Sequence, residues 1–263
     1  MTMESSRRTL LTGVALAGVA AMTPASTVAE GGPSRKPREV RTFGVITNSR
    51  PVGVLIDAEA DSAVKHVASS FAADLERVSG QAASRPTSSS EASGPMVIIG
   101  VLGGSAIIDR MIADGRLDVA DLKGEWEAYR HFVVDRPMPG VPRALVIVGS
   151  DRRGAVFGTY DLSEKIGVSP WHWFADVPVA RRRSVFLPID GDRNQPKVRY
   201  RGFFINDEAP ALSKWAFEKF GGANSKMYAH VFELLLRLKG NYLWPAMWAP
   251  RAFNDDDPQN KVL

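Results

Sequence analysis

The strongest constraint on the fold is an amphipathic segment, residues 225–239, that lies between two short apolar runs. Its apolar residues recur at the spacing of one helix face, namely Met227, Val231, Leu234, Leu235 and Leu238. This spacing predicts a helix with one buried and one solvated face. Asn224 or Ser225 can cap its start, and Gly240 can end it in a left-handed turn.

The two apolar runs, residues 202–205 and 242–247, are short and bounded by polar residues or glycine, as β-strands are. A strand, a helix and a second strand in this order normally form a right-handed crossover with parallel strands. The residues that follow each strand then lie at the same edge of the sheet. In open α/β sheets and in (β/α)8 barrels, this carboxyl edge is where ligands bind.

Polar and aromatic residues gather at that predicted edge. They are Asn206, Asp207 and Glu208 after the first run, Trp244 and Trp248 in and after the second, and Asn254, Asp255 and Asp256 farther on. Carboxylates carry out proton transfer in glycoside hydrolysis, and indole rings offer flat apolar faces to sugars. The pattern therefore predicts a carbohydrate site in which Asp207 and Glu208 are catalytic and the other residues bind substrate.

Simpler structural explanations exist for the same residues. Asn206 or Asp207 can cap a helix that starts near Ala209-Pro210. The acidic residues before Pro258 can form a solvated turn. Both explanations stay open from the spacing alone.

Three motifs in this region resemble glycoside hydrolase family 115, the xylan α-1,2-glucuronidases. They are RGFFINDEAPALSKWAFEKFGG (residues 201–222), FELLLRLKGNYLWPAMW (232–248) and AFNDDDP (252–258), and the similarity extends upstream over residues 145–179. The resemblance implies a secreted, inverting enzyme that removes glucuronic or 4-O-methylglucuronic acid from glucuronoxylan or xylo-oligosaccharides. It also implies an α/β domain ahead of a catalytic barrel, and a homodimer in the full-length enzyme.

An inverting glycosidase needs two carboxyl groups roughly 6.5–9.5 Å apart. Asp207 and Glu208 are neighbours at a strand end, where adjacent side chains diverge, so we expect the partner acid on a later strand. Two other classes of function stay open. One is a non-catalytic carbohydrate-binding protein that uses the same tryptophans, and the other is a protein-interaction module without a ligand.

Residues 1–30 have the features of a signal peptide. Arg7-Arg8 precedes an apolar stretch, residues 10–21, that is too short to span a bilayer, and Thr27 and Ala29 fit a T-x-A cleavage site. The paired arginines predict the twin-arginine route, and hence a secreted or periplasmic protein. Residues 31–40 are a flexible lead-in, and no later stretch is long and apolar enough to span a membrane.

Composition excludes several kinds of site. The chain has no cysteine and therefore neither disulfides nor cysteine metal sites, and the spacing of its histidines predicts no metal centre. The net charge of +4 is small, and basic runs such as residues 181–183 contain no aromatic residue, so we expect no nucleic-acid partner. We predict no cofactor.

Residues 41–195 alternate between strand and helix patterns and predict an α/β sandwich domain. The expected strands are residues 52–56, 96–99, 129–134 and 144–148, and the expected helices are residues 60–78, 106–113 and 154–166. Gly103-Gly104 belongs to a strand-to-helix turn, because no phosphate-binding motif surrounds it. Asp151 is expected to cap the third helix, and residues 193–197 to be a linker. Residues 171–174 either pack the first domain against the barrel, which we favour, or reach the sugar site, and Trp215 and Phe217 are expected to pack.

The predicted fold class is α/β, with the sandwich domain followed over residues 196–263 by the first βαβ unit of a (β/α)8 TIM barrel. A barrel needs about 200 residues or more, and this unit provides about a quarter of one. We therefore expect a truncated piece of a larger enzyme. By itself it is expected to fold in residues 41–190, to be loose or prone to aggregation after Pro196, and to show no glucuronidase activity.

Overall fold

The structure, a computed structural model, describes residues 40–191, 193–206, 208–248, 252–254 and 257–263. These residues belong to one compact unit, so the domain boundary predicted near residue 195 stays a prediction. The predicted signal peptide and all but the last residue of the lead-in lie outside the described residues. Among the described helices, none is long and apolar enough to cross a lipid bilayer.

The largest sheet has five strands in the order β3-β4-β6-β5-β8. They are β3 (Gly53–Leu55), β4 (Met96–Val101), β5 (Tyr129–Met138), β6 (Val141–Gly149) and β8 (Arg193–Asn194). β3, β4 and β6 are parallel, β5 is antiparallel to β6, and β8 is antiparallel to β5. The first four strands agree with the sequence-based prediction, whereas β8 falls in the stretch predicted as a linker.

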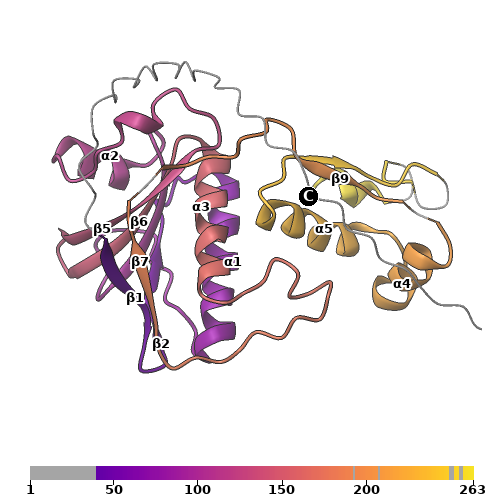
Figure 1. The fold of residues 1–263 in the computed structure, drawn as a ribbon, viewed down its shortest axis with the longest axis horizontal. Helices are drawn as coiled ribbons and strands as arrows, with labels where there is room; N and C mark the ends of the chain where they lie inside the picture. Colours follow the sequence, from indigo (N-terminus) through magenta and orange to yellow (C-terminus); the bar gives the residue numbers. More distant parts are fainter. Residues whose placement is uncertain (1–39, 192, 207, 249–251, 255–256) are drawn as a thin grey trace, which may run out of the picture. The chain divides into compact units, whose positions relative to one another are not determined.

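Helices cover both faces of this sheet (Figure 1). They are α1 (Ser62–Ser79), α2 (Ala106–Ala113), α3 (Arg152–Lys165) and the 3-10 helix η1 (Ala120–Leu122). Along β4, Val97 and Ile99 join the core that contains α1 and α3, whereas Met96 and Ile98 join the core that contains α2 and η1. Successive side chains of β4 thus enter two different cores, one on each face of the sheet. The predicted mixed α/β architecture is confirmed.

The helices start at side-chain caps and follow the predicted spans closely. Asp61 caps α1, Ser105 caps α2 and Asp151 caps α3, with side-chain oxygens 2.9, 3.2 and 2.7 Å from a backbone nitrogen of the first turn. The cap by Asp151 is the predicted one. Gly80 ends α1 in the left-handed conformation, at a φ of 84°, where a side chain would be strained.

A smaller antiparallel sheet, in the order β2-β1-β7, has no counterpart in the sequence-based prediction. Its strands are β1 (Arg41–Thr47), β2 (Arg50–Pro51) and β7 (Val185–Ile189). Phe43 and Leu187 pair in register, and both are buried in the core that contains α1. This sheet joins residues close to the start of the described chain to residues that follow α3.

A third sheet consists of two parallel strands, β9 (Gly202–Phe204) and β10 (Tyr242–Trp244). The elements around it are α4 (Ala211–Phe220), α5 (Ser225–Arg237) and the 3-10 helix η2 (Pro258–Lys261). The predicted parallel strand–helix–strand unit is therefore present, and Asn224 caps α5 as expected. Two strands do not establish a (β/α)8 barrel, so the barrel stays a prediction.

One detail of the prediction at the end of α5 is wrong. Lys239, not Gly240, adopts the left-handed conformation, with a φ of 59°. Gly240 is required for a different reason, because a Cβ there would lie 2.4 Å from Cδ1 of Leu235. The glycine therefore allows close packing against the helix rather than a left-handed turn.

Candidate functional site

The carboxyl ends of β9 and β10 lie side by side. Phe204 and Trp244 are directly paired in the parallel register, and the backbone nitrogen of Ile205 donates to the carbonyl oxygen of Trp244 over 2.8 Å. Asn206 and Glu208 follow β9 at this edge, and both are exposed. Asn206 therefore directly follows the residue that is bonded to Trp244, and Glu208 lies two positions farther along the chain.

Helix capping does not account for Asn206. The helix that follows, α4, starts at Ala211 with Pro210 in the cap position and has no side-chain cap hydrogen bond. Asp207, the other candidate cap and a predicted catalytic residue, lies outside the described residues. The polar side chain of Asn206 is thus available at the edge of the sheet.

Alternation along the two strands separates a covered face from an open one. Phe203 and Leu243 pack into the cluster formed with α5. On the opposite face, Phe204, Tyr242 and Trp244 are 53%, 52% and 48% exposed. This alternation assigns Trp244 to the open face, which the sequence alone left undecided.

Phe204, Tyr242 and Trp244 form the exposed aromatic surface of the open face, which we call the aromatic wall. The rings of Phe204 and Trp244 meet edge to face, with centroids 5.6 Å apart. The indole Nε1 of Trp244 donates to Sδ of Met247 over 2.9 Å, which fixes the orientation of the ring. Trp248 is 71% exposed, so it stands free beyond the end of β10.

Of the three acidic residues at positions 255–257, the structure describes only Asp257, and this residue has a structural role. Asp257 accepts hydrogen bonds from the backbone nitrogens of Ser225 and Gln259, at 2.7 and 2.9 Å. These bonds, that from Ser225 first, hold the pKa of Asp257 below its ordinary value. Asp257 therefore serves as a cap, whereas Asp255 and Asp256 lie outside the described residues.

Asn254, another predicted substrate-binding residue, is exposed in the turn before η2. The preceding residue, Phe253, donates its backbone nitrogen to the carbonyl oxygen of Ala246 over 2.9 Å. Its ring packs against Tyr228 of α5, with centroids 4.7 Å apart. These contacts fold the turn that carries Asn254 back against the segment that follows β10.

Aromatic packing behind the site agrees only partly with expectation. Trp173 stacks on His230 of α5, with ring centroids 4.0 Å apart and planes 5° from parallel. Trp215 contacts Trp173, as a packing residue should. The packing role expected for Phe217 is wrong, because this side chain is 70% exposed.

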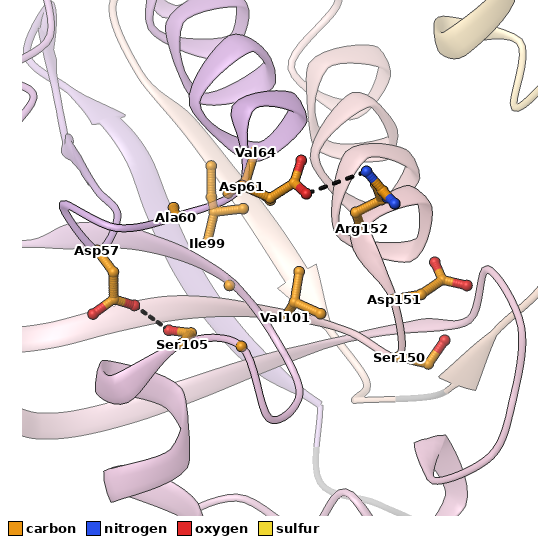
Figure 2. Close-up of a pocket in the computed structure, with 12 residues that line it drawn as sticks. Asp57, Ala60, Asp61, Val64, Ile99, Val101, Ser105, Ser150, Asp151 and Arg152 are labelled. Carbon is orange, nitrogen blue, oxygen red and sulfur yellow. Dashed lines mark hydrogen bonds and ion pairs between the residues drawn. The ribbon is translucent and has the colours of Figure 1, made fainter.

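A cleft of about 380 Å³ lies elsewhere, at the carboxyl ends of β3, β4 and β6 (Figure 2). Its polar groups are already used by the fold. Asp61 and Asp151 cap α1 and α3, and the hydroxyl of Ser105, which caps α2, donates to Asp57. No local sequence pattern marks this cleft, because its residues come from three separate segments of the chain.

Comparison with known proteins adds independent findings. Residues 193–263 match the model of glycosyl hydrolase family 115. The chain is also similar to the solved structure of BtGH115A, a family 115 4-O-methyl-α-glucuronidase with specificity for decorated arabinogalactans, at 28% identity and a TM-score of 0.69. That similarity covers 84% of this chain and 28% of BtGH115A, so this chain spans little more than a quarter of that protein.

The structure of CpGH84D is similar at 12% identity and a TM-score of 0.45, covering 86% of this chain and 39% of that one. This likeness is too distant to inform function. No protein in the curated set matches the sequence.

Proposed function

Since this chain belongs to glycosyl hydrolase family 115, we propose that it is part of a glycoside hydrolase that removes glucuronic or 4-O-methylglucuronic acid from xylan. The similar BtGH115A is specific for decorated arabinogalactans. Glucuronic acid on arabinogalactan is therefore the second substrate to test.

The observation that carries this proposal is the edge formed by β9 and β10. An aromatic wall with an exposed amide and an exposed carboxylate beside it combines the groups that a sugar site needs. In the proposed site, Phe204 and Trp244 stack on sugar rings, and Asn206 donates to a sugar hydroxyl. Trp248 and Asn254 extend the binding surface along the segment that follows β10.

Glu208 is the proposed catalytic carboxylate among the described residues. An inverting hydrolase uses one carboxylic acid to protonate the leaving oxygen and one carboxylate to activate water, roughly 6.5–9.5 Å apart. Asp207 is its sequence neighbour and is proposed to orient the sugar or the water. Because this chain spans only 28% of BtGH115A, we propose that the 263-residue chain alone has no glucuronidase activity.

The catalytic role is tested in a longer protein that carries this segment. Glu208→Gln should lower the release of uronic acid from glucuronoxylan by a factor of at least 100, the range expected for loss of a general acid or base. The melting temperature should not change, because Glu208 is exposed. Full activity of the variant would show that Glu208 has no catalytic role.

The 263-residue chain is tested in parallel. It is incubated with glucuronoxylan and with glucuronic-acid-decorated arabinogalactan, and free uronic acid is measured against Glu208→Gln. We expect no release above the variant from either polysaccharide. Release above that background would defeat the proposal that the chain alone is inactive.

A non-catalytic carbohydrate-binding protein is the second candidate, and the exposed aromatic wall favours it, since stacking on sugars needs no carboxylate. Tryptophan fluorescence during titration with an acidic xylo-oligosaccharide measures binding, and Trp244→Ala is the matched variant. Binding that requires Trp244, in a longer protein that releases no uronic acid, would favour this candidate over the hydrolase.

Export is the remaining part of the proposal. Arg7 and Arg8 stand ahead of the apolar stretch in the pattern of a twin-arginine signal. Replacing both by lysine should leave the precursor in the cytoplasm, measured by cell fractionation. Normal export of that variant would exclude the twin-arginine route.

A further inference from the structure

Three cations near β9, α5 and β10 meet three carboxylates of the preceding α/β layers. Arg237 pairs with Asp74 of α1, Arg201 with Glu127, and Lys239 with Asp161 of α3. The charges are therefore complementary across this contact, with the cations in residues 199–241 and the carboxylates in residues 41–195.

The pair between Arg237 and Asp74 is almost completely buried, with side-chain exposures of 2% and 0%. The guanidinium donates one hydrogen bond to the carboxylate, from Nη2 to Oδ1 at 3.0 Å, and its Nη1 lies at ion-pair distance, 2.8 Å, from Oδ2. Such a two-point contact fixes both distance and orientation. The guanidinium carbon also lies 4.6 Å from the ring centre of Tyr160.

The neighbouring carboxylates favour the charged form of Arg237. Burial would lower the pKa of Arg237, but Asp74 and Glu233 more than offset that effect and raise it. Burial alone would also raise the pKa of Glu233, yet Arg237 holds it below its ordinary value. The charged guanidinium is thus favoured by two carboxylates, Asp74 across the contact and Glu233 on its own helix.

A second contact holds the starts of both strands. Glu127 is buried and accepts from Arg201, the residue before β9, and from Nδ2 of Asn241, the residue before β10, over 2.9 Å. The backbone nitrogen of Arg201 donates to Oδ1 of Asn241 over 3.0 Å. Burial would raise the pKa of Glu127, but the bonds from Asn241 and Arg201 leave it lowered.

We infer that residues 41–195 are an internal scaffold for the unit β9–α5–β10, and that Asp74 and Glu127 are the residues that hold this unit folded. A sheet of two short strands is marginally stable by itself, and one face of this sheet is open. The contacts reach the starts of the strands and the end of α5. They leave the opposite, carboxyl edge free for a ligand.

A unit held in this way should be ordered after Pro196, whereas the sequence-based expectation is a loose segment there, and the experiment below distinguishes the two. The inference does not depend on the proposed function, because an inactive carbohydrate-binding protein would need the same scaffold. If the protein does not hydrolyse polysaccharide, the proposed scaffold role of residues 41–195 is not contradicted. The experiment below therefore measures folding and not activity.

The test uses the whole 263-residue chain. Wild type, Arg237→Met and the control Lys214→Met are treated with a low concentration of protease, and mass spectrometry follows cleavage in residues 41–190 and 196–263 separately. Lys214 pairs with Glu218 on the exposed side of α4, at 3.8 Å, so the control removes a charge away from the contact.

Wild type and Lys214→Met should be cleaved slowly in both segments. Arg237→Met should be cleaved at least ten times faster in residues 196–263, with little change in residues 41–190. Wild-type rates in the Arg237 variant would overturn the inference. Rapid loss of residues 196–263 from wild type would overturn it as well.

Loss of Arg237 leaves Asp74 buried without its cation, which can unfold the whole chain. In that case Asn241→Ala decides, since it removes the side-chain bonds of Asn241 to Glu127, Arg199 and Arg201 and leaves the ion pair between Glu127 and Arg201 in place. Cleavage of residues 196–263 should then rise at least two-fold, again without a change in residues 41–190. An unchanged rate would overturn the inference.

Discussion

The five-stranded sheet and the two-stranded sheet both contain parallel strands, but they differ in how much of their surface is buried. Both faces of the larger sheet are filled, and Val97 and Ile98 on its opposite faces are each 0% exposed. The smaller sheet buries only the face toward α5, while Phe204 and Trp244 stand open on the other. Complete burial stabilises the first sheet, whereas the second keeps an aromatic surface available for a ligand.

The carboxyl edges of the two sheets differ in the same way. At the larger sheet, Asp61 and Asp151 are occupied as helix caps, and Asp57 accepts from the cap of α2. At the smaller sheet, α4 starts without a side-chain cap, and Asn206 and Glu208 remain exposed. Position in the fold therefore identifies an edge where ligands can bind, and only the bonding of its side chains shows whether they are free to do so.

The largest expected effect contrasts a phenylalanine from each region. Phe71 of α1 is 0% exposed and Phe204 is 53% exposed. Phe71→Ala should lower the free energy of unfolding by about 3–5 kcal/mol, because it removes buried area and leaves a cavity. Phe204→Ala should cost less than about 1 kcal/mol. Urea denaturation measures both, and similar losses would mean that the face carrying Phe204 is buried in solution.

The next effect is a pH dependence located in the large sheet. His131 is buried, and burial lowers its pKa to about 4. Its Nε2 lies 2.9 Å from the carbonyl oxygen of Gly158, to which the neutral ring donates. The unfolded chain binds a proton below about pH 6.5 and the folded chain does not, so stability should fall between pH 6.5 and 4 by about 3 kcal/mol.

Urea denaturation at several pH values measures this loss, and His131→Gln is the matched variant because its amide can still donate to Gly158. The variant should lose less stability over the same range. Glu127 and Glu233, at the contact with the smaller sheet, have lowered pKa values and add a second loss that begins below about pH 4.5. A His131→Gln profile identical to wild type would show that another group titrates.

Sequence patterns located the elements whose signals are local. The helix faces of α1 and α5 and the cap at Asp151 were predictable, because spacing and capping involve residues only a few positions apart. The small antiparallel sheet was not, because β1 and β7 pair across most of the domain. Pro188 also weakens the strand pattern of β7, because proline is unfavourable inside a sheet. It is tolerated here because β7 is an edge strand.

The strands that carry the candidate site were predictable, whereas the roles of its residues stay predictions. The parallel pairing of β9 with β10 brings their carboxyl ends to one edge, as the spacing indicated. The direction of Trp244 required the position of α5, which covers the other face. The buried pair of Asp74 and Arg237 joins residues 163 positions apart, and no local pattern marks such a pair.

A third prediction tests how closely the two short strands must approach. A Cβ on Gly202 would lie 1.6 Å from the carbonyl oxygen of Tyr242, so Gly202→Ala should separate β9 from β10. Overpacking of this kind costs about 1–3 kcal/mol. Gly104→Ala in the larger domain is the control, because the nearest atom to its Cβ would be 3.5 Å away.

Hydrogen exchange of the amides in residues 202–205 and 242–244 measures this separation. Exchange should accelerate in Gly202→Ala and stay at the wild-type rate in Gly104→Ala. A Gly202 variant with normal protection would show that the smaller sheet can absorb a shift that the close-packed larger sheet cannot.

The smallest expected effect compares the helix caps of the two regions. Asn224 accepts from the backbone nitrogens of Lys226 and Met227 in α5, and Asp61 plays the same part in α1. Loss of such a cap typically costs about 1 kcal/mol. Asn224→Ala should cost somewhat less, because Asp257 still accepts from Ser225 at the same helix end.

The location of the effect is more informative than its size. If the smaller region opens separately, Asn224→Ala should speed hydrogen exchange in α5 alone, whereas Asp61→Ala should speed exchange throughout residues 41–190. Exchange is measured residue by residue at neutral pH, with global stability from urea denaturation. If Asn224→Ala instead speeds exchange equally in both regions, the contacts through Asp74 and Glu127 join them into one cooperative unit. The two-stranded sheet with its ligand edge would then not open separately from the larger layered domain.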